Sequence, residues 1–356
     1  MLVESATNGQ VISRIPRIRA KTLRRRYLVL FKLLGATVIA GVTAWSALAL
    51  WYRLPAPEAV RFGAASLFAL FGCITIVALF SRLCFRALSV FIMAFAVVAF
   101  WWITIEPAEH ADWAPDVARQ VTGKIEGERL ILTNVREFEW RTDKDFIERW
   151  TTRTYDLNGL RTLDFFMSYW AGPEMAHVIL SFGFTDGTFL AWSVEVRREK
   201  NGEFSPMADL FKNNPLVIIA AQEQDVVGVR SNVRGEDVQL YRLRATPEDA
   251  RLLLLEYVRD ANALAASPKF YNSILTNCTT TVVKMVRAVG DKVPLDWRLI
   301  VNGYLPDYAY DQGALDHRLD LAHLKALAHV EMRALEAGLT PEYSQLIRVG
   351  VPSPHN

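Results

Sequence analysis

One cysteine of this chain stands where a reactive thiol could be formed. Cys278 is the only cysteine beyond residue 84. Asn277 is a typical N-cap residue and Gly290 a typical helix stop, so the sequence predicts a helix that opens with Cys278 and reaches Val289. The N–H groups and the dipole at a helix N-terminus lower the pKa of a thiol and can also hold an oxyanion. A buried, unreactive thiol is the alternative interpretation.

A thiol nucleophile needs a base, and the base needs a group that orients it. Of the six histidines, His177 is the one on an expected core strand. It is the candidate base, although a strand histidine can equally be a hydrogen-bonded core residue. His323 and His329 are six positions apart, which misses the i, i+4 spacing of a zinc pair on a helix. We therefore expect no metal and no cofactor.

The partner of His177 follows from an expected hairpin. Residues 177–196 form two β-rich runs around Thr-Asp-Gly at 185–187, which is typical of a short hairpin loop. A three-residue loop with its glycine left-handed places His177 opposite Glu195 on one face of the sheet. Glu195 is then the expected orienter of the imidazole, with Ser193 as the substitute. A two-residue loop would separate the pair.

The elements that must position these residues follow a membrane anchor. The chain is 51% hydrophobic, 22% charged and carries a net charge of +2, which argues against a nucleic-acid binder. Residues 27–52, 60–80 and 88–105 are apolar runs close to the roughly 20 residues that a spanning helix needs. Seven basic residues precede the first run, so the N-terminus is expected in the cytoplasm and the chain beyond Ile105 outside it.

The expected organisation has four parts. They are a basic cytoplasmic N-terminus (1–26), a three-helix transmembrane anchor (27–105), a polar connector (106–124) and an extracytoplasmic domain (125–356). Within the domain, strands are expected at 216–221, 226–230 and 238–243. Thr246-Pro247-Glu248-Asp249 is a typical helix start, and the histidines of the tail are expected on a surface helix. Strands followed by helices predict an α+β fold with an antiparallel sheet.

An ordered set of short motifs is similar to one known family. The set comprises Asp164-Phe165-Phe166-Met167, Trp170, the strand from His177, Ser193-Val194-Glu195, Glu223-Gln224-Asp225, Arg230 to Arg234, Tyr241, Phe270-Tyr271-Asn272 and Asn277-Cys278-Thr279-Thr280. It resembles the periplasmic domain of the Lnb family of bacterial lipoprotein N-acyltransferases, over roughly residues 125–310. The order of the histidine before the cysteine is also similar to that in permuted papain-like folds of the NlpC and lecithin–retinol acyltransferase (LRAT) groups. Enzymes of the LRAT group take acyl chains from phospholipids.

The resemblance implies roles for the candidate residues. Cys278 would be the nucleophile and His177 the base, with Glu195 as third member and Asn277, Ser193 and Thr279 as oxyanion or supporting groups. Four arginines are candidate phosphate ligands, because a guanidinium matches a phosphate: Arg153, Arg197, Arg230 and Arg234. Tyr271 is a further candidate substrate-binding residue. Gln224 departs from the arginine expected in the family, which bears on the choice of donor.

The implied reaction moves an acyl chain from a membrane phospholipid, through a Cys278 thioester, to the N-terminal amine of a diacylglyceryl-cysteine lipoprotein. The implied location is the bacterial inner membrane, with the catalytic domain in the periplasm. Two other functions remain open. One is a membrane-anchored cysteine hydrolase, a peptidase or amidase of the periplasm, and the other is a non-enzymatic lipid-binding membrane protein.

Overall fold

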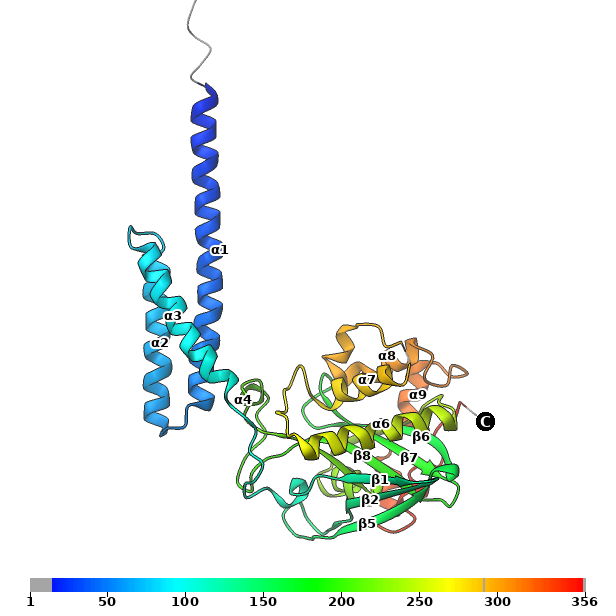
Figure 1. Cartoon of the computed structure of the whole chain (residues 1–356). Coiled ribbons are helices and arrows are strands. Elements are labelled where there is room, and N and C mark those ends of the chain that lie inside the picture. The colour runs from blue at the N-terminus through cyan, green and yellow to red at the C-terminus, as the bar shows by residue number, and fades with distance from the viewer. Residues whose placement is uncertain (1–14, 291, 355–356) are drawn as a thin grey trace, which may run out of the picture. The chain divides into compact units, whose positions relative to one another are not determined.

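The chain forms two compact units, Met1–Glu106 and Pro107–Asn356 (Figure 1). A computed structural model describes residues 15–290 and 292–354, with side chains from residue 26 onward. Each unit has its own hydrophobic core.

The first unit consists of three long apolar helices, as predicted. They are α1 (Ile15–Arg53), α2 (Glu58–Ala78) and α3 (Cys84–Ile103), and each is long and apolar enough to cross a membrane. Helices α1 and α2 approach closely at Gly72, where a Cβ atom would lie 2.1 Å from the Thr43 hydroxyl. Residues 15–26 were expected to be part of a basic tail but already belong to α1; residues 1–14 lie outside the described part of the chain.

The second unit is built on a large, mostly antiparallel sheet. Its strand order is β1-β2-β9-β8-β7-β6-β10, and β5 also pairs with β2. Only β2 and β9 pair in parallel, at Arg136 and Ala221. The strands are β1 (Thr122–Glu126), β2 (Arg129–Arg136), β5 (Trp150–Asp156), β6 (Leu160–Tyr169), β7 (Ala176–Phe184), β8 (Phe189–Val196), β9 (Leu216–Ala221) and β10 (Asp237–Arg242), beside a small sheet of β3 (Glu139–Trp140) and β4 (Phe146–Ile147).

The expected connector at 106–124 is instead part of this folded unit. It contains a turn of 3-10 helix at Pro115–Val117 and the start of β1, and Val117 and Val121 are buried. The segment looks polar because His110, Asp112 and Asp116 are interspersed among few apolar residues. Asp116, however, is itself buried and pairs with Arg198 at 2.9 Å, so its charge is matched within the fold.

Helices cover one face of the sheet with the larger core. Helix α6 (Pro247–Ala266) lies across the strands, and α7 (Cys278–Ala288) packs beside it (Figure 1). Thr246 and Asp249 form the predicted capping box of α6. This core joins Trp192 of β8 to Tyr257 of α6, whose ring centroids are 5.1 Å apart.

Short helices cover the opposite face. They include α5 (Glu223–Val226), α10 (Glu331–Ala337) and α11 (Tyr343–Leu346). Arg348 connects the chain after α11 to β6 and to α5, since its guanidinium contacts Asp164 at 2.8 Å and Glu223 at 2.6 Å, and all three are nearly inaccessible to solvent. The remaining helices are α4 (Pro206–Asp209), α8 (Leu305–Asp311) and α9 (Leu321–Ala328); of the tail histidines, His323 lies on α9, His329 ends it and His317 precedes it.

The prediction of a strand at 226–230 is wrong. The chain there forms α5 and then a π-helical turn at Val229–Val233. The valines that suggested a strand do pack into a core, but from a helical backbone. Asp225 determines this path, because its buried carboxylate accepts hydrogen bonds from Arg136 and from the indole of Trp140.

The hairpin of β7 and β8 has the predicted register. Gly187 is left-handed with φ 82°, the N–H of Phe184 donates to the carbonyl of Thr188, and Ile179 pairs with Ser193. This three-residue loop keeps His177 and Glu195 on the same face of the sheet, where their side chains meet.

Candidate active site

Cys278 lies at the first turn of α7, as its sequence context predicts. Asn277 caps the helix: its side-chain oxygen accepts from the N–H of Thr280 at 2.8 Å, and the Thr280 hydroxyl accepts from the N–H of Asn277 at 2.9 Å. The cap determines where the helix begins and therefore where the thiol points. Cys278 is only 5% exposed. The side chain of Asn277 is occupied by this capping and by a bond to Ser273, so it supports the helix start.

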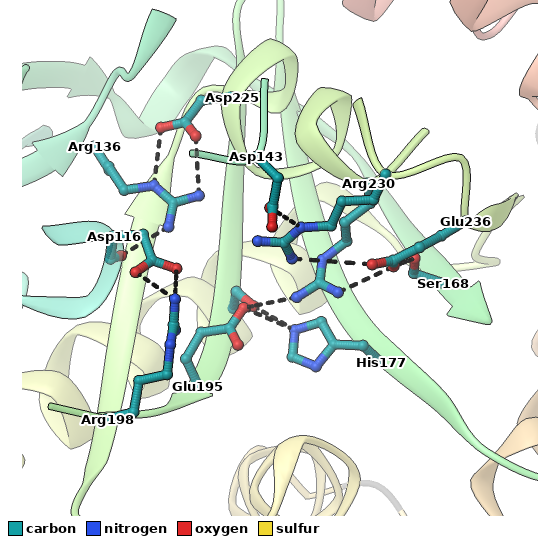
Figure 2. Close-up of polar contacts among 12 residues, drawn as sticks. Asp116, Arg136, Asp143, Ser168, His177, Glu195, Arg198, Asp225, Arg230 and Glu236 are labelled. Atoms are coloured by element: carbon teal, nitrogen blue, oxygen red, sulfur yellow. Dashed lines mark hydrogen bonds and ion pairs between the residues drawn. The ribbon is translucent and has the colours of Figure 1, made fainter. Parts of the chain in front are cut away.

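His177 connects the thiol to a buried carboxylate. The His177 ring lowers the pKa of Cys278 through hydrogen bonding and charge. Nε2 of this ring lies 2.6 Å from the Ser193 hydroxyl and 3.0 Å from Glu195 (Figure 2). Ser193 also donates to Glu195 at 2.6 Å. Because Nε2 is engaged by Ser193 and Glu195, Nδ1 is the nitrogen left for the sulfur. The structure thus brings together the predicted thiol, base and orienter.

The electrostatics of this triad favour an ion pair. Burial lowers the pKa of His177, but the charge of Glu195 outweighs it, so the pKa rises to about 9. Burial raises the pKa of Cys278, yet the hydrogen bond and charge of His177, together with the N–H of Val178, lower it overall. Burial also acts against ionised Glu195, whose pKa is nevertheless held well below its usual range by His177 and Arg230. Compared with a free thiol and a free imidazole, the site therefore favours a thiolate beside an imidazolium.

Arg230 contacts the same carboxylate oxygen of Glu195 as His177 does. Its guanidinium lies 3.2 Å from Glu195 and 3.2 Å from Glu236, and Figure 2 shows His177 and Arg230 converging on the same carboxylate. Glu236 is held in turn by the hydroxyl of Ser168 and by Arg234. Arg230 was predicted as a phosphate ligand, but its contacts are those of a residue that positions Glu195.

Asn302 was not predicted and holds the two halves of the site together. Its side-chain oxygen accepts from the N–H of Ala176 at 3.0 Å, and its Nδ2 donates to the carbonyl of Ala176 at 2.6 Å and to the Thr279 hydroxyl at 2.8 Å. The same nitrogen lies 3.9 Å from the sulfur of Cys278. Asn302 therefore ties the strand that carries His177 to the helix that carries Cys278, and Thr279 acts through it.

The thiol and imidazole line a cavity of about 440 Å³. The cavity wall includes the apolar side chains of Trp170, Met175, Phe204 and Ile300, and also Tyr271, Arg230 and Arg234 among the predicted residues. Burial, followed by the charge of Cys278, raises the pKa of Tyr271, so its hydroxyl stays protonated. An apolar wall beside a polar reactive centre suits a substrate that is apolar over part of its length.

Two predicted arginines do not line this cavity. Arg153 pairs with Glu137, while Arg197 donates to the carbonyl of Ala118 and lies over the ring of Trp113. Gln224, the departure from the family pattern, bonds Gln222 and does not line the cavity either.

Two arginines that the sequence did not indicate do line it, Arg136 and Arg198. Arg136 is buried against Asp225, whereas Arg198 is partly exposed beside Asp116 (Figure 2). No group of three or more His, Cys, Asp or Glu side chains within residues 15–290 and 292–354 could hold a metal ion.

The part of the chain that carries the thiol and the imidazole matches a known family. Residues 146–303 match the family model described as the Lnb N-terminal periplasmic domain. Over this segment the chain is similar to the Lnb periplasmic domain. The resemblance seen in the sequence is thereby confirmed, and the matched segment lies in the second unit, which follows three apolar helices. No curated protein and no solved structure matches the chain. The Lnb-type segment contains Cys278, His177, Glu195, Arg230 and Asn302, but not Asp116 or Arg136.

The proposed ion pair predicts the pH dependence of Cys278 alkylation. Since the pKa of Cys278 is lowered, iodoacetamide should modify it with a titration midpoint below that of an ordinary thiol. In His177→Ala the strongest effect that opposes burial is removed, so the midpoint should rise above that of the wild type. Peptide mass mapping of the full chain measures both, with the exposed His323→Ala as control. A wild-type midpoint at or above that of a free thiol contradicts the ion pair.

Arg230 is expected to influence the pKa of His177 through charge. Its positive charge lowers the pKa of His177, so Arg230→Gln should raise this pKa and move the alkaline limb of the alkylation profile to higher pH. Arg230→Lys should restore most of the wild-type profile. The matched control is Arg234→Gln, because Arg234 is 3.9 Å from Glu236 and makes no ion pair with Glu195. In Arg230→Gln, a lower rate of Cys278 alkylation at every pH, without a shift of the alkaline limb, would indicate a purely structural role for Arg230.

Replacing Asn302 should disconnect strand and helix. Asn302→Ala leaves buried groups of Ala176 and Thr279 without partners, which costs about 2–4 kcal/mol of unfolding free energy, and the reactivity of Cys278 should fall with it. Asn262 makes the same two backbone bonds, to Gly123, at an exposed position away from the cavity. Asn262→Ala should therefore lose less stability and keep the thiol reactive. Equal effects in denaturant unfolding and alkylation would overturn the assignment.

Proposed function

We propose that this protein is a thiol-dependent acyltransferase that passes a fatty acyl group from a membrane phospholipid to the N-terminal amine of a diacylated lipoprotein. The observation that carries the proposal is one cavity lined by buried Cys278 and by His177, whose ring contacts Glu195, in a chain with three helices long and apolar enough to cross a membrane. The match of residues 146–303 to the Lnb periplasmic domain supports it. The bacterial inner membrane is the proposed location.

In the first half-reaction the Cys278 thiolate attacks the carbonyl carbon of a glycerol ester. A C–S bond forms, the bond from that carbon to the glycerol oxygen breaks, and the His177 imidazolium gives its proton to the departing oxygen. The products are an acyl-thioester and a lysophospholipid. Asn277 already occupies the N–H of Thr280, so the N–H groups of Cys278 and Thr279 are those that would meet the oxyanion.

In the second half-reaction the lipoprotein amine attacks the thioester. A C–N bond forms, the C–S bond breaks, and His177, now neutral, accepts the proton that the amine loses. The thiolate and the imidazolium are regenerated. Splitting the transfer in this way lets two lipid substrates use one cavity in turn. Its apolar residues, among them Met175 and Phe204, suit the acyl chains of both.

The membrane spans favour lipid substrates over soluble ones. A phospholipid and a lipoprotein both keep their chains in the bilayer, so tethering the enzyme there replaces encounters in solution with encounters in two dimensions. A cysteine hydrolase of soluble wall fragments would gain nothing from three spans. The order of a histidine strand followed by a cysteine helix is also that of permuted papain-like enzymes, which is the fold relationship that we propose for this domain.

Partly exposed arginines at the cavity are the proposed phosphate ligands. Arg198 and Arg234 are each about a third exposed, paired with a single short carboxylate contact at Asp116 and Asp143. A guanidinium with unused N–H groups can still bind a phosphate oxygen. Arg153 and Arg197, predicted for this role, lie outside the cavity wall.

The thioester is the test of the proposal. Full-length protein in phospholipid vesicles should gain the mass of one acyl group on Cys278, and hydroxylamine should remove it. His177→Ala should lower the rate of acylation by roughly 10²–10⁴-fold, the usual contribution of a general base. Intact-mass spectrometry measures the adduct. Cys73→Ser, which changes another unpaired cysteine, is the control and should acylate normally.

The acceptor and the source of the acyl group are tested together. When only the acyl chains of the phospholipid are labelled, a diacylglyceryl-cysteine peptide should acquire a labelled acyl chain in an amide bond at its N-terminal amine. Label appearing only when the peptide's own glycerol esters carry it would overturn the phospholipid donor while keeping the thioester. Release of free fatty acid alone would show a hydrolase. No adduct on an enzyme that still modifies the peptide would remove the thioester scheme.

A further inference from the structure

A second concave surface lies beside the active site on the outer side of α7. It is a groove of about 650 Å³, and α7 contributes Thr280, Val283, Lys284 and Arg287 to it, the i, i+3, i+4 and i+7 positions of one helix face. The opposite face of α7 carries Cys278 and Met285 into the core. The same short helix therefore presents the thiol on one side and this groove on the other.

The rim of the groove consists of exposed apolar side chains. They come from the segments just before and just after α7: Leu275 (76% exposed), Leu295 (90%), Trp297 (58%) and Ile300 (61%). Water-soluble domains seldom gather such side chains on one surface without a partner for them. Arg287 holds the second segment in place, because its guanidinium donates to the carbonyl of Val293 at 2.6 Å.

The groove adjoins the active-site cavity. Ile300 lines both, and Ser273 and Asn277 of the cavity wall adjoin Leu275 in the chain. Trp170, Met175 and Phe204, which line the cavity, are also more than two-fifths exposed, so the apolar surface extends around its mouth. Whatever covers this surface also covers the approach to the thiol.

We infer that this surface, defined by Leu275, Leu295, Trp297 and Ile300, docks into the lipid bilayer. The chain carries three membrane helices, so a bilayer is always present as a partner. Aliphatic side chains around a tryptophan, with Lys284 and Arg287 lining the same groove, have the composition of surfaces that lie at the boundary between headgroups and acyl chains. The basic pair is complementary to anionic lipid, although Lys284 also contacts Asp260 at 2.7 Å.

Docking would open the cavity mouth to lipid rather than to water. A lipid-borne substrate could then reach Cys278 without exposing its apolar chains to water, an exposure that is unfavourable for every methylene group. Docking of this surface into the bilayer does not require the transfer reaction proposed above. The reaction and the docking therefore succeed or fail in separate measurements.

The test measures insertion directly, with the full chain in vesicles of phosphatidylethanolamine and phosphatidylglycerol. Cys73, Cys84 and Cys278 are changed to alanine, and a fluorophore is attached at Leu295→Cys. Spin-labelled lipids with the nitroxide in the acyl region should quench it at least about threefold more than at a control site, since interfacial surfaces bury roughly 5–10 Å into the bilayer. The control is Met332→Cys, an exposed apolar position (68%) on the opposite face of the sheet.

A second labelled position tests whether quenching at residue 295 is only a local effect of the label there. Leu275→Cys lies on the other segment of the rim and should be quenched in the same way. Equal quenching at 295 and 332, or none at both 275 and 295, would overturn the docking surface. Quenching at the rim in a protein whose wild-type form never acylates Cys278 would keep the docking surface and reject the transfer reaction.

Discussion

The arrangement of the domain depends on one buried negative charge, the carboxylate of Glu195. His177 and Arg230 both contact the same oxygen of this carboxylate, and the hydroxyl of Ser193 donates to it as well. A carboxylate removed from water is costly unless its partners are well placed. The positions of β7, β8 and the π-helical turn at Val229–Val233 are thus coupled, since each supplies one of these groups. The imidazolium that Glu195 stabilises then stabilises the thiolate, which links the packing of the sheet to the chemistry of Cys278.

A second constraint joins the thiol to the sheet. Cys278 comes from a helix that is packed on one face, whereas His177 belongs to a strand whose neighbouring side chains point to both faces. Asn302 bridges them through the backbone of Ala176 and the hydroxyl of Thr279. A backbone clamp of this kind holds the distance between two elements without using a charged group, so it leaves the electrostatics of the ion pair unchanged.

Local signals in the sequence were sufficient for much of this site. The caps at Asn277 and Thr246, the left-handed Gly187 and the three apolar runs each depend on residues close together in the chain, and each was predicted. What was missed depends on distant partners. Arg136 and Asn302 act on residues 89 and 126 positions away, and no local pattern marks them. The valines after Asp225 were misassigned for the same reason, because a remote arginine determines the local backbone.

The attachment of Arg348 to Asp164 and Glu223 has a consequence for the order of folding. Asp164 of β6 also pairs with Arg242 on the neighbouring strand β10, so its charge can be matched within the sheet. Glu223 of α5 is buried and takes its ion pair from Arg348, 125 positions further along the chain. Because a buried carboxylate without its cation is costly, the layer around α5 consolidates only when the segment that follows α11 has docked.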